Sequence, residues 1–504
     1  MTSLLSSDML EPVGTDFRPE KDGRPEGAKG FAMEHLTRER MGASETRSQG
    51  FAYRLLKIFT DIRPGEAVTV LLLTLNIFLL LLAYYLIKPI REALVISSKG
   101  PLVRSYLAGA QAVLFVFVIK GFSRLASRVP RHLLITWVTL FFMSNLCLFY
   151  VFHLGGMSMG TMGIAFFIWV GVFNIMVVAQ FWGFANDLYA EEAGKRLFPL
   201  VAFGQTAGAL FGSSIAGAII RPLGSQFAYI MMLMTAALLG ICIGLTWIIH
   251  RRELRQIKER SLGAGPAVPE AIKIKELPLK KGGGFHLIFK SRYLLFYALL
   301  IFFLNYVNYS GETIFGLTVN KAAAHAVQMG TTGGLDKTQF IASSYTKYQF
   351  IYNLVALIVQ LFLVSRIFKW VGVSGALLFL PVIALGGYTM VSFGASLALI
   401  TWVKGLENGV DYSLMNTIKG ALFLITTREE KYKGKAAAET FFYRSGDALA
   451  ALMLFIGFTY LSFTAESLAK INIFAALIWI LFCVLVIREY KKIKERKFRS
   501  GEVG

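Results

Sequence analysis

The sequence predicts an all-α, polytopic membrane protein with about twelve transmembrane helices in two six-helix bundles. Hydrophobic residues make up 55% of the chain and charged residues only 16%, well below the roughly 25% charged content of soluble domains. Apolar runs of about 20 residues, enough to cross a hydrocarbon core of about 30 Å, recur along the chain. Basic clusters separate these runs, as the loops of a membrane protein do.

The predicted spans follow one another from residue 67 to residue 488. They are expected at 67–87, 102–120, 132–153, 162–186, 197–220, 226–249, 293–316, 343–365, 371–391, 394–424, 436–462 and 469–488. The seventh and tenth are unusually polar. The tenth is therefore expected either to be broken or to line a cavity.

The positions of the basic loops predict the orientation. Lys and Arg concentrate in alternate loops, which the positive-inside rule places in the cytoplasm. These loops are Lys120 to Arg131, Lys195–Arg196, Arg251 to Arg292, Arg366–Lys369, Arg428 to Lys435 and the tail from Arg488 to Arg499. Both termini are therefore predicted to be cytoplasmic, which requires an even number of spans.

The longest internal connection divides the spans six and six. The predicted organisation is a disordered cytoplasmic tail (1–50) without a signal peptide, an N-terminal bundle (51–249), a basic linker (250–292), a C-terminal bundle (293–490) and a basic tail (491–504). This is the layout of the major facilitator architecture, in which two bundles face a central cavity. Acidic–basic loops at Glu191–Arg196 and Glu429–Lys435 indicate either an internal duplication or two unrelated loops.

Several classes of protein are disfavoured. The net charge of +21 is spread over short loop clusters, and no nucleic-acid-binding module is visible. The three cysteines lie in apolar runs, and neither they nor the histidines have metal-ligand spacing. Gly204, Gly208 and Gly212 recur every four residues, which predicts close helix packing rather than a phosphate loop. We therefore expect no metal, no cofactor and no enzymatic activity.

Charged residues near the ends of predicted spans are the first candidates for a binding site, because intramembrane charge usually faces a cavity or a partner. Lys88 and Arg91 follow the first span and form either a snorkelling interfacial pair or a cationic pair ready for an anion. Asn186 and Asp187 end the fourth span. Glu312, in the polar part of the seventh span, is either a headgroup-level acid or a cavity-facing one.

The tenth span carries further candidates. Lys404, Glu407 and Asp411 share one helix face, and either neutralise one another or line a cavity. Lys419 has no acidic residue three or four positions away within the span, so it is the better candidate for binding an anion. Asn416 lies nearby, and Arg444 in the eleventh span is expected to pair with Asp447.

Several segments together resemble the ATP/ADP translocase family, the nucleotide transporters of plastids and intracellular bacteria. They are Lys88–Val95 with Lys99-Gly100, Phe181–Asp187 with Lys195–Leu200, Glu312-Thr313, Tyr412–Leu414, Thr417–Lys419 and Lys433–Ala437. The resemblance implies alternating-access transport of ATP, ADP or a related nucleotide, by exchange or uptake, across a bacterial inner membrane. Its implied substrate-binding residues are Lys88, Arg91, Asn186, Asp187, Glu312 and Lys419, with Lys404, Asp411, Asn416 and Arg444 as additional candidates.

The motif at the tenth span departs from the family pattern. Asp411 stands where the family usually has Lys, Asn416 where it has Asp, and Gly420 where it has Glu. One expected positive charge is thus negative, which favours a divergent member. Two alternatives stay open: an ion-coupled transporter of another anionic solute, with Glu312 or Asp187 as the proton or sodium site, and a non-transporting membrane protein whose 250–292 segment binds anionic lipid or a partner. No oligomeric state is predicted.

Overall fold

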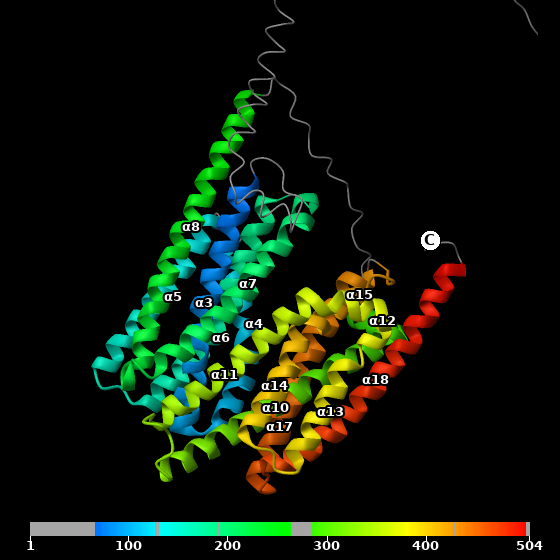
Figure 1. Ribbon diagram of the computed structural model, residues 1–504. Helices are drawn as coiled ribbons and strands as arrows, with labels where there is room; N and C mark the ends of the chain where they lie inside the picture. Colours follow the sequence, from blue (N-terminus) through cyan, green and yellow to red (C-terminus); the bar gives the residue numbers. More distant parts are fainter. Residues whose placement is uncertain are drawn as a thin grey trace, which may run out of the picture. The chain divides into compact units, whose positions relative to one another are not determined.

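The computed structural model describes residues 66–126, 129, 131–189, 191–263, 284–427 and 429–499, and every regular element in these ranges is a helix (Figure 1). Nine of the described helices are long and apolar enough to cross a membrane. The prediction of a polytopic α-helical membrane protein is therefore confirmed. The predicted tail 1–50 and residues 264–283 of the predicted linker lie outside the described residues.

The twelve predicted segments fall mainly on helices, but the ninth, 371–391, is divided by a turn at Leu377 and Leu378 between α12 and α13. Hydropathy alone supports nine crossings among the described residues. The exact number of twelve therefore stays a prediction. The first helix is longer than expected. It continues from Glu66 to Lys99, so Lys88 and Arg91 lie inside the helix and not at its end.

The first group of helices comprises the elements up to residue 263. They are α3 (Glu66–Lys99), α4 (Pro101–Ala126), α5 (Arg131–Leu154), α6 (Met159–Leu188), α7 (Glu191–Ile220), the 3-10 turn η1 (Gly224–Gln226) and α8 (Phe227–Gly263). The central helix is α3, which packs against α6, α7 and α8. Its side chains are buried nearly all round over residues 80–87, as expected for a helix that is apolar on every face.

Glycines bring α7 against α3 along their length. A Cβ atom added to Gly208 would lie 2.2 Å from the Phe78 carbonyl oxygen, and one added to Gly204 or Gly212 would lie 2.7 Å from the carbonyl oxygen of Thr74 or Leu82. Only a residue without a Cβ permits such close approach of two helix backbones. The prediction that these glycines serve helix packing is confirmed.

The second group begins after residue 283. It comprises α9 (Gly284–Lys290), α10 (Arg292–Gln328), α11 (Lys337–Ile358), η2 (Val359–Leu363), α12 (Val364–Ala376), α13 (Phe379–Ser392), α14 (Leu397–Val410), η3 (Asp411–Met415), α15 (Asn416–Leu422), η4 (Glu430–Gly434), α16 (Lys435–Ala437), η5 (Ala438–Phe442), α17 (Tyr443–Tyr460) and α18 (Ala465–Arg499). The predicted irregularity in the tenth span is a π-helical segment, η3, between α14 and α15. Such segments are frequent at functional sites.

The two groups meet along two seams. α11 packs against α3 and α7, and α4 packs against α10 and α17 (Figure 1). These contacts fix the relation of the groups within the described residues, but the predicted boundaries of the two bundles stay a prediction.

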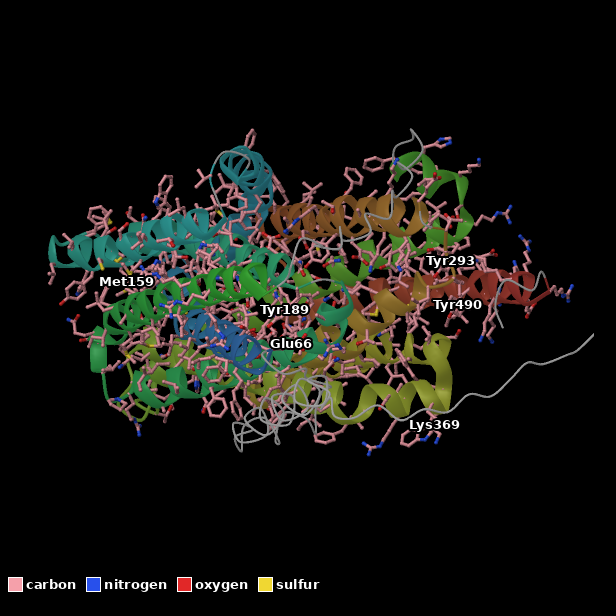
Figure 2. All side chains as sticks on the ribbon, turned by 90° about the horizontal axis from the view of Figure 1, so that it is seen from above. Glu66, Met159, Tyr189, Tyr293, Lys369 and Tyr490 are labelled. Atoms are coloured by element: carbon pink, nitrogen blue, oxygen red, sulfur yellow. The ribbon has the colours of Figure 1, made fainter. Side chains whose placement is uncertain are left out.

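The two ends of α3 define two sides of the molecule. At the beginning of α3, Glu66 accepts a hydrogen bond from Arg196 of α7 at 3.1 Å, and Figure 2 shows Tyr189 beside Glu66. We call this the α3-start side. The opposite side, where α3 ends and α4 begins, is the α3-end side.

Candidate functional site

A cavity of about 890 Å³ lies between the two groups, within the roughly 300–1,000 Å³ typical of small-molecule sites. We call it the large cavity. Its walls come from α3, α6 and α7 of the first group and from α11, η2, η3 and α15 of the second. The lining side chains include Tyr84, Tyr85, Lys88, Asn174, Trp182, Phe203, Gln205, Thr206, Asn353, Gln360, Tyr412 and Asn416. Polar amides, aromatic rings and a single charged residue therefore face one space.

A second cavity of about 290 Å³, which we call the inner chamber, adjoins the large cavity. The two share three lining residues, Tyr84, Lys88 and Tyr412. The inner chamber contains far more charge. Its charged lining residues are Lys88, Arg91, Arg104, Arg444, Glu92, Glu312 and Asp447, which leaves one positive charge in excess.

Lys88 stands at the junction of the two cavities. Its Nζ donates a hydrogen bond to the Tyr352 hydroxyl at 2.7 Å and lies 4.9 Å from the ring centre of Tyr85 and 5.1 Å from that of Tyr352. No ion pair joins Lys88 to a carboxylate of the described residues. The side chain is thus a half-buried cation that is stabilised by aromatic faces and faces a cavity rather than lipid headgroups.

Arg91 lies one turn further along α3, in the inner chamber. Its Nε donates to Glu92 Oε1 at 3.0 Å, and its guanidinium lies 4.6 Å from the ring centre of Phe167. The other oxygen of Glu92 accepts a hydrogen bond from Arg104 Nε at 2.8 Å. Glu92 is therefore a buried carboxylate held between two guanidinium groups, an arrangement that lowers the cost of burying each charge.

Arg104 links this pair to the second group of helices. Its Nη2 lies 3.3 Å from Glu312 Oε2. Glu312 Oε1 also accepts hydrogen bonds from Asn408 Nδ2 at 3.1 Å and from the Tyr348 hydroxyl. Arg91, predicted at the end of the first span, and Glu312, predicted in the seventh, thus belong to one network of ion pairs and hydrogen bonds.

Arg104 and Glu92 were not among the predicted site residues. Arg104 lies near the beginning of the predicted second span, where a basic residue is ordinary, and Glu92 follows Arg91 directly. Their signal was present, because both fall in or beside apolar runs that otherwise contain little charge. The tyrosines around Lys88 were also missed as a group, since they come together only through tertiary contacts.

The charged face of the tenth span is partly self-neutralised. Lys404 Nζ lies 3.0 Å from Glu407 Oε1 and 2.9 Å from Asn308 Oδ1, and the Tyr388 hydroxyl donates to Glu407 Oε2 at 3.1 Å. Asp411 does not join this pair. Its Oδ1 atom is buried and makes no hydrogen bond within the described part of the chain.

Arg444 pairs with Asp447 at 3.1 Å, as expected, and both residues also line the inner chamber. Asn416 is exposed in the large cavity, where its Nδ2 donates to the Tyr412 carbonyl oxygen at 3.0 Å.

The remaining predicted residues lie outside both cavity linings. Asn186 and Asp187 are exposed at the end of α6, and Lys419 is half-buried in α15. α6 ends on the α3-start side, since Tyr189 lies beside Glu66. α15 ends beside the start of α10, where Tyr293 donates to the Leu422 carbonyl oxygen. The start of α10 lies on the α3-start side, because beyond its other end Gly333 accepts a hydrogen bond from Arg221, which follows α7 on the α3-end side. The three residues therefore lie toward the mouth of the large cavity and not at its centre.

Two groups of membrane helices around a polar cavity are the architecture of the major facilitator fold. Solved structures share this fold. A bacterial homologue of the human lysosomal transporter Spinster has a TM-score of 0.55 at 13% identity, covering 86% of this chain and 99% of that one. The nucleoside transporter NupG has a TM-score of 0.55 at 12% identity, covering 84% of this chain and 99% of that one. An auto-inhibited POT family peptide transporter has a TM-score of 0.57 at 11% identity, covering 84% of this chain and 97% of that one.

The chain belongs to the TLC ATP/ADP transporter family, whose pattern it matches over residues 164–490. ADP,ATP carrier protein 2 of Chlamydia trachomatis is 23% identical over 358 residues, and the match covers 65% of each chain. ADP,ATP carrier protein 5 of Rickettsia bellii is 24% identical over 359 residues, covering 64% of this chain and 68% of that protein. This chain thus spans about 65% of the length of the first of these relatives.

Membership confirms the resemblance that the sequence motifs indicated. The family is one of transporters and not of enzymes, in agreement with the prediction.

Proposed function

We propose that the protein transports nucleotides of the ATP/ADP kind across a bacterial inner membrane by alternating access, with the large cavity as the substrate site. Family membership supports the nucleotide, and the names of the chlamydial and rickettsial relatives agree with it. The observation that carries the proposal is Lys88. It is a cation without a carboxylate partner among the described residues, and it stands between a nucleotide-sized cavity and a charged chamber.

The phosphates would bind at Lys88 first. A phosphate oxygen would replace the Tyr352 hydroxyl as the acceptor of the Lys88 Nζ hydrogen bond. A charged acceptor would thus take the place of a neutral one. Charge-assisted hydrogen bonds are roughly twice as strong as neutral ones, and the low dielectric of a membrane-embedded site strengthens them further. Arg91 is the next donor along α3 and would bind the terminal phosphate in the inner chamber.

The same phosphates would compete with Glu92 and Glu312 for Arg104. Arg104 binds Glu92 of the first group and Glu312 of the second, so an anion that binds its guanidinium would weaken the ion pair with Glu312 that joins the two groups. Other bonds across the seam lie nearby, including Ser105 to Thr313 at 2.8 Å and Gln339 to the Ile220 carbonyl oxygen at 3.3 Å. All lie on the α3-end side.

The structure then represents one of the two access states. Among the described residues, hydrogen bonds between the groups run from the level of Ala209 toward the α3-end side, whereas the large cavity extends toward the α3-start side. With both termini in the cytoplasm, as proposed from the basic loops, this is the inward-open state. Switching requires only that the substrate binds the two states with different affinity.

The two bundles, 51–249 and 293–490, are proposed as the moving bodies. Asn186, Asp187 and Lys419 are proposed as residues that the substrate meets at the cavity mouth. Lys404, Asp411, Asn416 and Arg444 stay secondary candidates.

Reconstituted transport tests the proposal directly. Proteoliposomes loaded with ADP should take up labelled ATP saturably, and external ADP should compete. Lys88→Ala should reduce uptake at least about tenfold because one charged hydrogen bond is worth roughly 1.5–3 kcal/mol, and Lys419→Ala should reduce it less. Lys492→Ala, which removes an exposed pair with Glu489 on α18, is the control.

Two results would contradict this account. Unchanged uptake after Lys88→Ala would show that Lys88 is not the anion site. Uptake that follows a pH gradient without competition by nucleotides would favour the ion-coupled alternative.

A further inference from the structure

We propose that Trp182 and Gln205 form a nucleobase subsite in the wall of the large cavity, in which the Gln205 amide nitrogen donates to a ring acceptor of the base. The inference rests on the proposed function and adds to it the part of the site that distinguishes a nucleotide from any other polyphosphate. Both residues are half-buried and line the cavity, one from α6 and the other from α7.

The orientation of the Gln205 amide follows from its partner. Trp182 Nε1 lies 3.0 Å from Gln205 Oε1. An indole N–H can only donate, so the oxygen of the amide must face Trp182. The amide nitrogen, with its two N–H donors, is thereby directed elsewhere. The subsite therefore offers donors, which match the unprotonated ring nitrogens and carbonyl oxygens of a base.

The Trp182 indole is held in place by one aromatic ring of its own helix, α6, and one of α7. Its ring centre lies 5.8 Å from that of Phe181 at an interplanar angle of 83° and 5.7 Å from that of Phe198 at 85°. Edge-to-face contacts of this kind fix a ring without covering it completely. Phe203 and Tyr412, exposed by 44% and 48%, line the same cavity, so aromatic surface is available for stacking a base.

A further amide lies on the same wall. Asn174 and Trp182 are eight residues apart on α6 and share a helix face, and both line the cavity. The Asn174 side chain makes no hydrogen bond with any residue that the structure describes. It can therefore complement Gln205 with both a donor and an acceptor, as the edge of a nucleobase requires.

The distance to Lys88 suits a nucleotide. The glycine contacts show that α7 runs parallel to α3, with Gly204 at the level of Thr74, Gly208 at Phe78 and Gly212 at Leu82. Gln205 therefore lies at the level of residue 75, about 20 Å along the helix axis from the Cα of Lys88 at 1.5 Å per residue. The long side chains of both residues cover part of this separation. A nucleoside di- or triphosphate can reach both, whereas inorganic phosphate or a free nucleoside cannot.

Binding to the purified full-length protein in detergent tests the subsite, with ATP and inorganic tripolyphosphate as probes. Wild type should bind ATP at least about tenfold more tightly than tripolyphosphate, in the range expected for one stacked base. Trp182→Leu and Gln205→Leu should lower ATP affinity about tenfold while the affinity for tripolyphosphate stays within about twofold. Trp182→Phe, which keeps an aromatic ring between Phe181 and Phe198, should have an intermediate effect.

Matched controls separate recognition from folding. Gln226→Leu changes an exposed glutamine that contacts His153 outside the cavity, and should leave both affinities unchanged. The Gln205→Glu variant keeps the size of the side chain but replaces the donors with an acceptor, and should lose ATP affinity as Gln205→Leu does.

The outcomes are distinguishable. If the Trp182 and Gln205 variants bind ATP as wild type does, or lose ATP and tripolyphosphate affinity in parallel, the subsite is overturned and the proposed function stands. If wild type binds tripolyphosphate and ATP equally, the subsite is likewise overturned. If wild type binds no nucleotide at all, both proposals fail.

Discussion

At the scale of single residues, the decisive feature is a lysine whose charge is balanced by rings and a hydroxyl rather than by a carboxylate. A charge inside a membrane protein is usually paired or faces water. Lys88 has neither an acidic partner among the described residues nor a lipid-facing position, and its hydrogen bond goes to Tyr352. This bond holds the ammonium in place, and in the proposed mechanism a substrate phosphate displaces it.

Removal of the Tyr352 hydroxyl should therefore strengthen the binding of ATP. In Tyr352→Phe the ring that contacts Lys88 is retained, but the competing acceptor is lost. ATP affinity, measured by calorimetry on the purified protein, should rise about tenfold or more, since a hydrogen bond to a charged group contributes roughly 1.5–3 kcal/mol. A fall in affinity would show that the hydroxyl helps to bind substrate instead. Tyr460→Phe, on an exposed tyrosine at the end of α17, is the control.

At the scale of helices, α7 and α3 act as one unit because glycines hold their backbones together. The same contact sets the level of Gln205 relative to Lys88. The wall of the cavity and its charged end are consequently fixed to each other before substrate arrives, which lowers the ordering cost of binding.

A methyl group at the tightest glycine should loosen this unit. Gly208→Ala places a Cβ atom 2.2 Å from the Phe78 carbonyl oxygen, whereas Gly244→Ala in α8 has nothing within 4 Å. We expect Gly208→Ala to destabilise the protein by roughly 1–3 kcal/mol, the usual cost of overpacking, and Gly244→Ala to be neutral. Thermal unfolding in detergent, followed by tryptophan fluorescence, compares the two. Equal melting temperatures would contradict the packing role.

At the scale of the whole molecule, the two groups of helices are joined by a short list of polar contacts on the α3-end side. Among these contacts Arg104 carries the most charge, because it binds both the buried carboxylate of Glu92 and the half-buried carboxylate of Glu312. Breaking one such interaction leaves an uncompensated buried charge, which is strongly destabilising. The access state seen here should therefore depend on Arg104.

Arg104→Gln should shift the population toward opening on the α3-end side. Spin labels on Met157→Cys, between α5 and α6, and on Thr331→Cys, between α10 and α11, report the separation of the groups there when Cys147, the exposed cysteine, is replaced by Ser. Pulsed electron resonance should give a longer, broader distance distribution for Arg104→Gln than for the parent. The same distribution in both would contradict the gating role, and Lys492→Gln serves as the unchanged reference.

The sequence predicted the helices and much of the charge, because both signals are local. Apolar runs predicted the span positions, glycine spacing predicted close helix packing without naming the partner helix, and intramembrane charge pointed to Lys88, Arg91 and Glu312. The sequence could not predict the contacts of Arg104, whose partners lie 12 and 208 residues away, nor the contact between Trp182 and Gln205. These contacts depend on which helix faces pack against each other, and the local hydrophobic pattern of a single sequence does not determine that packing.

The central claim, that nucleotide occupies the large cavity at Lys88, is tested most directly by protection of a cysteine from labelling. Ala202 is exposed in the cavity, so Ala202→Cys in the Cys147→Ser background should react with a water-soluble maleimide. Saturating ATP should suppress that reaction, and Lys88→Ala should abolish the suppression, while Thr331→Cys, on a loop of the α3-end side, should label equally with and without ATP. Labelling of Ala202→Cys that is indifferent to ATP would contradict the account.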